Sequence, residues 1–118
     1  MELETKVIRN TLVVRIKGEM DLYVTDNLRQ EIYGFFENNN KMKQLILNLT
    51  GVSFIDSSGL GLIIGCYKKV TADKGQMYIV GAQPTVEKIL YFSGINKLIP
   101  ILGSEQEVFH KSMEKIRR

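Results

Sequence analysis

The stretch Ile55-Asp56-Ser57-Ser58-Gly59-Leu60-Gly61 joins two segments of different hydrophobic pattern. Before it, residues 44–49 form a short and almost continuous apolar run, which is typical of a strand buried on both faces of a sheet. After it, apolar residues recur at helical spacing: Leu60, Ile63, Ile64, Tyr67 and Val70. The stretch therefore predicts a tight turn from a buried strand into a helix.

This turn has the residue types that begin a helix. Asp56 or Ser57 is expected to cap the helix through a side-chain oxygen, which places Ser58 in the first turn. Backbone N–H groups in that turn lack partners within the helix, and the helix dipole is positive there. A phosphate on Ser58 is therefore expected to meet free N–H donors, which makes Ser58 a candidate switch residue. A plain helix cap without a further role is the alternative interpretation.

Three glycines follow in the predicted helix, at positions 59, 61 and 65. Each costs about 0.5–1 kcal/mol relative to alanine in a helix, so propensity alone does not favour them. Close packing on the chain's own sheet would account for one or two. Gly61 and Gly65 lie one turn apart and are candidates for a face that a partner contacts. The sequence leaves these two interpretations open.

The composition is that of one globular domain spanning residues 1–118, with 44% hydrophobic and 25% charged residues. The formal net charge of +3 comes from the C-terminal end alone. There Lys111, Lys115, Arg117 and Arg118 are offset by Glu114, and the rest of the chain is neutral. A basic last turn is typical of a solvated helix end, so we expect no nucleic-acid surface.

The single cysteine, Cys66, rules out an intramolecular disulfide and a cysteine-based metal cluster. This pattern is typical of a reducing compartment. No apolar run reaches the roughly 20 residues that span a bilayer, and the acidic start Met1-Glu2-Leu3-Glu4 is unlike a signal peptide. We therefore expect a cytoplasmic protein that does not bind a membrane.

The remaining pattern predicts an alternation of strands and helices. A hairpin is expected from strands at 3–9 and 11–17, followed by an acidic loop at 18–21 and a helix at about 24–38 that Thr25 or the preceding turn caps. After the strand at 43–49 and the central helix, which should end near 73–75, we expect a strand at 77–80, a helix at 84–92 and an edge strand at 98–101. The last helix begins at a capping box, Ser104 to Glu107. This order favours an α/β fold with a mixed β-sheet and helices packed mainly on one side.

Residue patterns for catalysis are missing around Ser58. A serine nucleophile needs a base, and the only histidine, His110, lies in the terminal helix, where it is expected to be exposed. The chain has neither a Gly-x-Ser-x-Gly elbow nor a Gly-Lys-Ser/Thr phosphate loop at this turn. Asp21 and Asp56 are more typical of turn caps than of a metal or acid–base pair. We expect no catalytic residues, no metal and no cofactor; an enzyme and a nucleotide-binding module remain as rival classes.

The segment Phe54–Gly65, with Gly18–Asp21 before it and Tyr67-Lys68 after it, resembles the anti-sigma-factor antagonists, nearest to their sporulation sigma-F branch. These are single STAS domains, and the likeness runs the length of the chain. It implies a STAS-like fold and the function of an anti-anti-sigma factor. The unphosphorylated protein would bind an anti-sigma factor that is also a serine kinase, and so release the sigma factor. Phosphorylation of Ser58 would abolish this binding, and a serine phosphatase would restore it.

The resemblance also implies where the partner binds. The residues expected at this contact are Glu19, Asp21, Asp56, Ser57, Gly59, Leu60, Gly61 and Leu62. Ser57 would not accept phosphate. Cys66 departs from the sporulation pattern, which has a basic residue before Tyr-Lys, and is expected at the edge of the docking helix. Because the environmental-stress antagonists share the motif, a phosphate- or nucleotide-binding regulatory module of that branch is the alternative. The free protein is expected to be a monomer.

Overall fold

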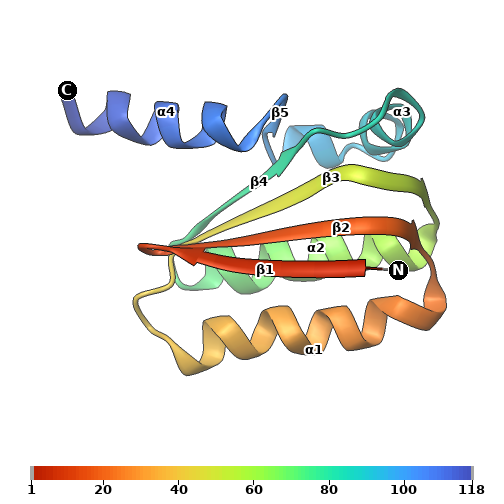
Figure 1. Ribbon diagram of the computed structural model, residues 1–118, viewed down its shortest axis with the longest axis horizontal. Coiled ribbons are helices and arrows are strands. Elements are labelled where there is room, and N and C mark those ends of the chain that lie inside the picture. Colours follow the sequence, from red (N-terminus) through yellow and green to blue (C-terminus); the bar gives the residue numbers. More distant parts are fainter. Residues whose placement is uncertain (1, 118) are drawn as a thin grey trace.

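The computed structural model describes residues 2–117, with the side chains of residues 2–111, and its centre is a five-stranded mixed sheet in the order β1-β2-β3-β4-β5 (Figure 1). The strands are β1 Glu2–Ile8, β2 Thr11–Met20, β3 Gln44–Ile55, β4 Gln76–Val80 and β5 Ile101–Leu102. The helices are α1 Leu22–Asn38, α2 Ser57–Ala72, α3 Pro84–Phe92, the 3₁₀ helix η1 Ile95–Lys97 and α4 Glu105–Arg117. β1 and β2 pair antiparallel, and the other neighbouring strands pair parallel.

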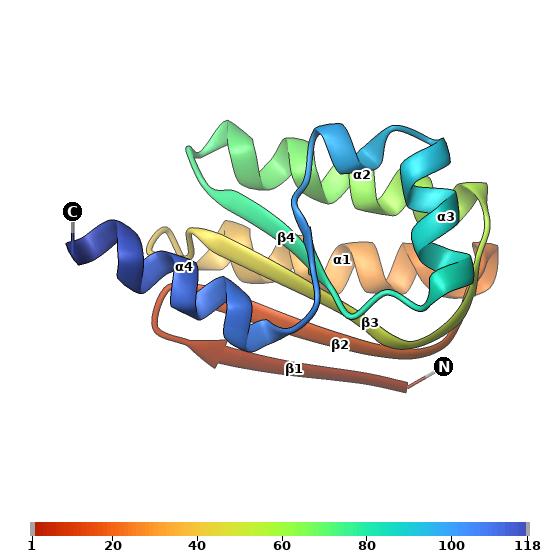
Figure 2. The same cartoon turned by 90° about the horizontal axis from the view of Figure 1, so that it is seen from above.

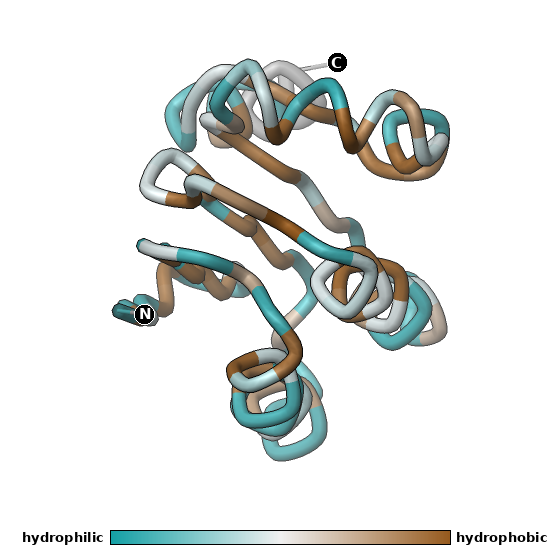
Figure 3. The backbone as a smooth tube through the Cα atoms, turned by 90° about the vertical axis from the view of Figure 1, so that its right-hand side faces the viewer, coloured by the Kyte–Doolittle hydropathy of each residue, from teal (hydrophilic) through white to brown (hydrophobic). Residues whose placement is uncertain are grey.

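Helices cover both faces of the sheet, but unequally. α1 and α2 lie side by side on one face, and α4 lies over the other (Figures 1 and 3). The larger core cluster joins the sheet to α1 and α2 and includes the buried side chains of α3. The smaller cluster on the α4 face consists of Val13, Ile46, Tyr78, Val80 and Val108. The expected mixed sheet with helices mainly on one side is confirmed.

The apolar run at 44–49 is the first half of β3, where Leu45, Ile46 and Leu47 are completely buried. β3 is longer than its sequence pattern predicts and continues to Ile55. Its second half pairs with β2 through two register shifts, at which β3 has an additional residue. These bulges break the alternation of buried and exposed side chains, so the usual strand pattern is lost beyond residue 49.

The segment Gly18-Glu19-Met20-Asp21 was expected to be an acidic loop, and this expectation is wrong. Gly18 to Met20 are the end of β2 and pair with β3, and Asp21 is the N-cap of α1. The Tyr23 N–H donates to Asp21 Oδ1 at 3.1 Å, so Asp21 caps α1 and Thr25 does not. Thr25 is buried in the first turn, where its hydroxyl donates to the Leu22 carbonyl.

The C-terminal elements also differ in detail from the expected ones. β5 is confined to Ile101–Leu102 and follows η1. Ser104 Oγ accepts a hydrogen bond from the Glu107 N–H at 3.3 Å, as a capping box requires. The return bond differs, because Glu107 Oε2 accepts from the Gly103 N–H. Ser104 is therefore the cap, but the carboxylate reaches one residue further back.

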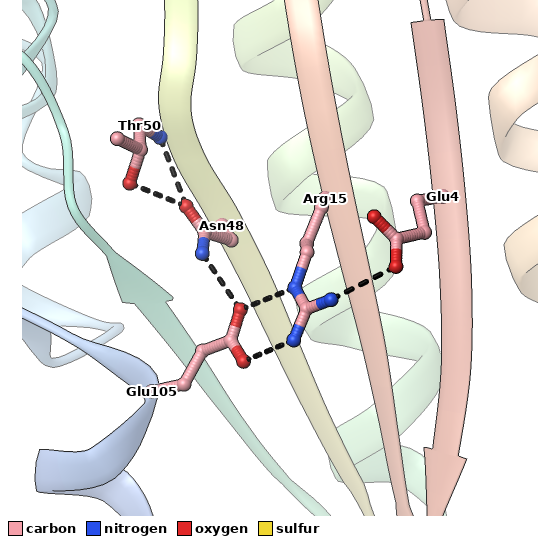
Figure 4. A network of polar contacts seen from close by, with 5 residues as sticks. All are labelled: Glu4, Arg15, Asn48, Thr50 and Glu105. Atoms are coloured by element: carbon pink, nitrogen blue, oxygen red, sulfur yellow. Dashed lines mark hydrogen bonds and ion pairs between the residues drawn. The ribbon is translucent and has the colours of Figure 1, made fainter.

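A polar network fastens the start of α4 to the sheet (Figure 4). The Arg15 guanidinium donates to both oxygens of Glu105 at 2.8 Å and to Glu4 at 2.9 Å. Asn48 donates to the same Glu105 carboxylate at 2.7 Å, while its own oxygen accepts from Thr50. The pKa of Glu105 is held below its usual value mainly by the hydrogen bond from Arg15, and to a smaller extent by the one from Asn48. The network thus ties α4 to β1, β2 and β3.

Candidate functional site

β2 and β3 end side by side, and each leads directly into a helix. Met20 pairs with Ile55 at the ends of the strands, and the Asp56 N–H donates to the Met20 carbonyl at 3.3 Å. Asp21 then caps α1 and Asp56 caps α2, so both helices begin at the same edge of the sheet (Figures 1 and 2). This arrangement brings together Glu19, Asp21, Asp56, Ser57 and Ser58.

The sequence left open whether Asp56 or Ser57 caps α2, and in the structure the cap is Asp56. Its Oδ1 atom accepts from the Ser58 N–H at 2.8 Å and from the Gly59 N–H at 3.1 Å. Ser57 is exposed and Ser58 is half-buried. The expectation that a phosphate on Ser58 meets free donors is therefore wrong for these two amides, because a carboxylate already occupies them. A phosphate at this position would lie beside an existing negative charge.

Two of the residues expected to contact a partner are buried in the chain's own core. Leu62 is completely buried, and Gly59 lies so close to β2 and β3 that an added Cβ would be 2.6 Å from Ile55 Cγ1 and 3.1 Å from the Met20 carbonyl oxygen. In the free chain, therefore, neither Gly59 nor Leu62 presents an exposed surface to a partner. Both instead support α2 from beneath, because they fix its distance from the sheet.

The two glycines considered for a partner face have different surroundings. A Cβ at Gly65 would be 2.7 Å from the Tyr33 hydroxyl, so this glycine lets α1 and α2 approach each other. Lys69 lies 5.7 Å from the centre of the Tyr33 ring and pairs with Glu37 at 3.0 Å across the same interface. Gly61 is exposed, and a Cβ there would meet nothing within 4 Å. Of these two glycines, Gly61 is the one without a packing reason within the domain.

Cys66 is completely buried, although it was expected at the edge of the docking helix. Burial raises the pKa of its thiol to about 12. His110 lies on α4, on the opposite face of the sheet from α2. Among the described residues, no group of three His, Cys, Asp or Glu side chains is placed to hold a metal ion. Within residues 2–117, no helix combines the length and apolar character that a membrane span requires.

This edge also has an apolar component, which was not expected from the sequence. Leu22 and Tyr23, directly after the Asp21 cap, are 64% and 88% exposed, and Phe54, which pairs with Glu19, is 48% exposed. A signal was present for Tyr23, which lies off the helical stripe of the buried residues of α1, Thr25, Leu28, Ile32 and Phe36. Leu22 is three residues before Thr25, at the spacing of that stripe, so its exposure was not predictable in this way. Exposed large apolar side chains beside charged ones are typical of an interaction surface.

The chain and its fold match a known family. The family model of the STAS domain matches residues 2–108, and the chain belongs to the STAS-domain family. An anti-sigma F factor antagonist of Paenibacillus polymyxa is 32% identical over 105 residues, which cover 89% of each chain. Within the family, the chain thus groups with the anti-sigma-factor antagonists, as its motif implied.

Two solved structures of one such antagonist are similar over nearly the whole chain. The anti-sigma factor antagonist SpoIIAA in its unphosphorylated form has a TM-score of 0.84 at 28% identity, covering 96% of this chain and 97% of that one. The Bacillus cell fate determinant SpoIIAA in the phosphorylated form has a TM-score of 0.76 at 28% identity, covering 94% and 99%.

Proposed function

We propose that this protein is an anti-anti-sigma factor, whose unphosphorylated form binds an anti-sigma factor and so releases a sigma factor. Family membership and the named antagonists among its relatives support this function. The single observation that carries it is the position of Ser58, half-buried in the first turn of α2 beside the N-terminus of α1. This edge joins a modifiable hydroxyl, acidic side chains and exposed apolar ones on a rigid scaffold.

The docking surface that we propose comprises three acidic, three apolar and three small or partly buried residues around Ser58. They are Glu19, Asp21, Asp56, Leu22, Tyr23, Phe54, Ser57, Leu60 and Gly61. Apolar side chains would provide the buried centre of the contact, and the carboxylates would favour a partner with basic groups. Gly61, with open space above it, would let the partner come close to the backbone of α2.

Phosphorylation of Ser58 is the switch in this proposal. A phosphate adds about −1.5 to −2 charges and considerable bulk in the middle of the docking surface. Because Asp56 already accepts from the Ser58 and Gly59 amides, the new charge is not neutralised there without displacing the cap. The phosphate and the Asp56 carboxylate repel each other within the docking surface, and burying both beneath a partner carries a high desolvation cost, so docking is lost.

The partner is an anti-sigma factor that is also an ATP-dependent serine kinase, and a separate serine phosphatase removes the phosphate. The existence of SpoIIAA structures in both phosphorylation states supports such a cycle. In it, this chain is a binding partner and a kinase substrate rather than an enzyme, and it needs no cofactor. A partner that holds a sigma factor acts where transcription takes place, which implies a cytoplasmic protein.

Locating the phosphate tests the proposed site. The full chain is incubated with ATP and a cognate anti-sigma kinase, and the peptide from residues 56–68 is analysed by fragmentation mass spectrometry. We expect phosphate on Ser58, its loss in Ser58→Ala, and its retention in the matched control Ser57→Ala. Phosphate on Ser57, or modification that persists in Ser58→Ala, would contradict the assignment.

Calorimetric binding to the same partner tests the role of charge. Ser58→Ala should bind as the unmodified protein does, and Ser58→Asp should bind much more weakly. Ser58→Asn has nearly the size of Ser58→Asp without its charge, so it separates bulk from electrostatics. Equal affinities for Ser58→Ala and Ser58→Asp would contradict the electrostatic account.

A further inference from the structure

A cavity of about 360 Å³ lies near the C-terminal end of α2, between that helix, the edge of β4 and α4. Tyr67 and Thr71, in the last turns of α2, form one wall. Thr71 is thirteen positions after Ser58 in α2, which corresponds to roughly 20 Å along the helix. The cavity is thus distinct from the docking surface, and its volume lies in the range of small-molecule sites, roughly 300–1,000 Å³.

The cavity exists because β5 is too short to cover β4. β5 pairs with β4 only at Ile79 and Val80, so the first half of β4 has no neighbouring strand on this side (Figure 2). The Ile79 N–H donates to the Pro100 carbonyl at this edge. Because backbone groups alternate along a strand, the N–H and C=O of Met77 point to the same edge, where Met77 lines the cavity.

An added peptide strand fits this gap poorly. Only Met77 would offer its backbone pair to a new strand before Pro100 and β5 block further pairing. Strands in proteins average about five to six residues, so one residue's hydrogen bonds would be a weak basis for strand addition. The open edge therefore favours a compact occupant.

Side chains from both faces of the sheet give the cavity its chemistry. Tyr67 approaches from the α2 side, while Tyr78 belongs to the core cluster on the α4 side. The Tyr78 hydroxyl donates to Gln76 Oε1 at 2.6 Å, which leaves the Gln76 amide nitrogen available as a donor. Lys111 is the one charged residue among the described lining residues, and it is exposed. Aromatic walls, donors and one positive charge suit an anion with an apolar body.

We propose that this cavity binds a small molecule with a flat apolar body and a single carboxylate- or sulfonate-like head group. The body lies against Tyr67 and Leu98 at the open edge of β4, and the head group pairs with Lys111 and the Gln76 amide. Apolar contact provides most of the affinity, and the charge at the rim sets the preference for anions. The site needs neither Ser58 nor a protein partner, so it stands or falls separately from the proposed switch.

Two fluorescent compounds that share one body test this preference. 1-Anilinonaphthalene-8-sulfonate carries the anionic head, and N-phenyl-1-naphthylamine lacks it. Each is titrated into the full ¹⁵N-labelled chain, and amide shifts are followed by NMR. We expect saturable shifts at Met77 and Leu98 with both probes. The sulfonate should bind about three- to fivefold more tightly, as one partly exposed ion pair allows.

Variants separate the cavity from nonspecific adsorption. Lys111→Gln should abolish the advantage of the sulfonate, whereas Lys68→Gln, at an exposed lysine of α2 outside the cavity, should preserve it. Leu98 is 50% exposed at the cavity, so Leu98→Trp should fill the space without unfolding the chain and weaken both probes at least fivefold. Unsaturable binding, shifts elsewhere, or unchanged affinities in Lys111→Gln and Leu98→Trp would overturn the proposal. Shifts at Met77 with an extended peptide but with neither probe would also overturn it.

Discussion

Asp56 and Ser58 are joined by a hydrogen bond of 2.8 Å, donated by the Ser58 amide to Asp56 Oδ1. The same oxygen accepts from Gly59, so one carboxylate satisfies two of the first amides of α2. Asp56 thus has two separable properties, the geometry of a cap and a negative charge beside the proposed phosphorylation site. Substitutions at this position distinguish them.

Removing the Asp56 cap should destabilise the protein. Asp56→Ala loses both amide hydrogen bonds and is expected to lower the free energy of unfolding by about 1 kcal/mol, within the range of about 0.5–2 kcal/mol for N-caps. Asp56→Asn keeps an oxygen acceptor and should lose much less. Urea denaturation followed by circular dichroism measures both. Equal destabilisation by the two variants would show that charge, rather than capping geometry, matters for α2.

Alanine at the two neighbouring glycines should have opposite effects on stability. At Gly59 the added methyl group meets Ile55 and the Met20 carbonyl, so Gly59→Ala should destabilise by about 1–3 kcal/mol. At Gly61 it meets nothing within 4 Å, so Gly61→Ala should stabilise by about 0.5–1 kcal/mol through helix propensity. Thermal unfolding of the two variants provides a matched comparison. If Gly61→Ala destabilised the free chain, an internal packing role for Gly61 would follow.

The ion pair between Arg15 and Glu105 should make stability depend on acid pH. Because the pKa of Glu105 is lowered on folding, its contribution is present above the unfolded-state pKa of about 4.3 and is lost as pH falls through the folded-state value. Glu105→Gln is expected to cost about 1 kcal/mol at pH 7, since both partners are partly exposed. Denaturation at pH 7 and pH 3 should show this difference shrinking. A constant difference at both pH values would argue against the ion pair as its cause.

Cys66 should be unreactive in the folded protein. It is completely buried, and burial raises the pKa of its thiol to about 12, so very little thiolate forms at pH 8. A chromogenic disulfide reagent is expected to label the thiol within seconds when the chain is unfolded in roughly 8 M urea. Without urea, the labelling should be slow. Rapid labelling of the native chain would indicate frequent opening of the core between α2 and the sheet.

Tyr23 should contribute to partner binding but not to folding. It is 88% exposed, so Tyr23→Ser is expected to change the free energy of unfolding by less than about 0.5 kcal/mol. Affinity for the anti-sigma partner should fall at least tenfold, as truncation of an interface aromatic commonly does. Phe92→Ser, at a 98% exposed aromatic residue at the end of α3, is the matched control and should leave affinity unchanged. Equal losses in both variants would place the partner elsewhere.

Local signals made the strand–turn–helix unit predictable. The apolar run at 44–49 identifies β3, and the helical spacing of apolar residues after Ser58 identifies α2, both without tertiary information. Asp56 and Ser57 were the two candidates for the cap of α2. The second half of β3 was not predictable, because its bulges depend on pairing with β2. Asp21 was assigned to a loop for a related reason, since the end of β2 is held in extended form by β3.

The glycines show the same limit at the candidate site. All three are unusual in a helix by sequence alone, but the packing reasons for Gly59 and Gly65 lie in residues distant along the chain. Gly65 is explained by the hydroxyl of Tyr33 on α1 and Gly59 by Met20 at the end of β2. The family motif placed Leu62 among the residues of the docking face. In the structure, the orientation of α2 on the sheet turns the Leu62 side chain into the core. The family motif thus locates the site, and packing decides which of its residues face outward.

The network around Arg15 bears on the order in which the chain assembles. Arg15 and Glu105 are 90 residues apart, so their contact closes nearly the whole chain into a loop. The Glu105 carboxylate gains its full set of donors only when β2 and β3 already lie together, because Arg15 and Asn48 come from different strands. α4 should therefore dock late in folding and be released early in unfolding, before the sheet loses its hydrogen bonds. Amide exchange would then be faster in α4 than in β3, which makes the C-terminal helix the region where the domain first opens.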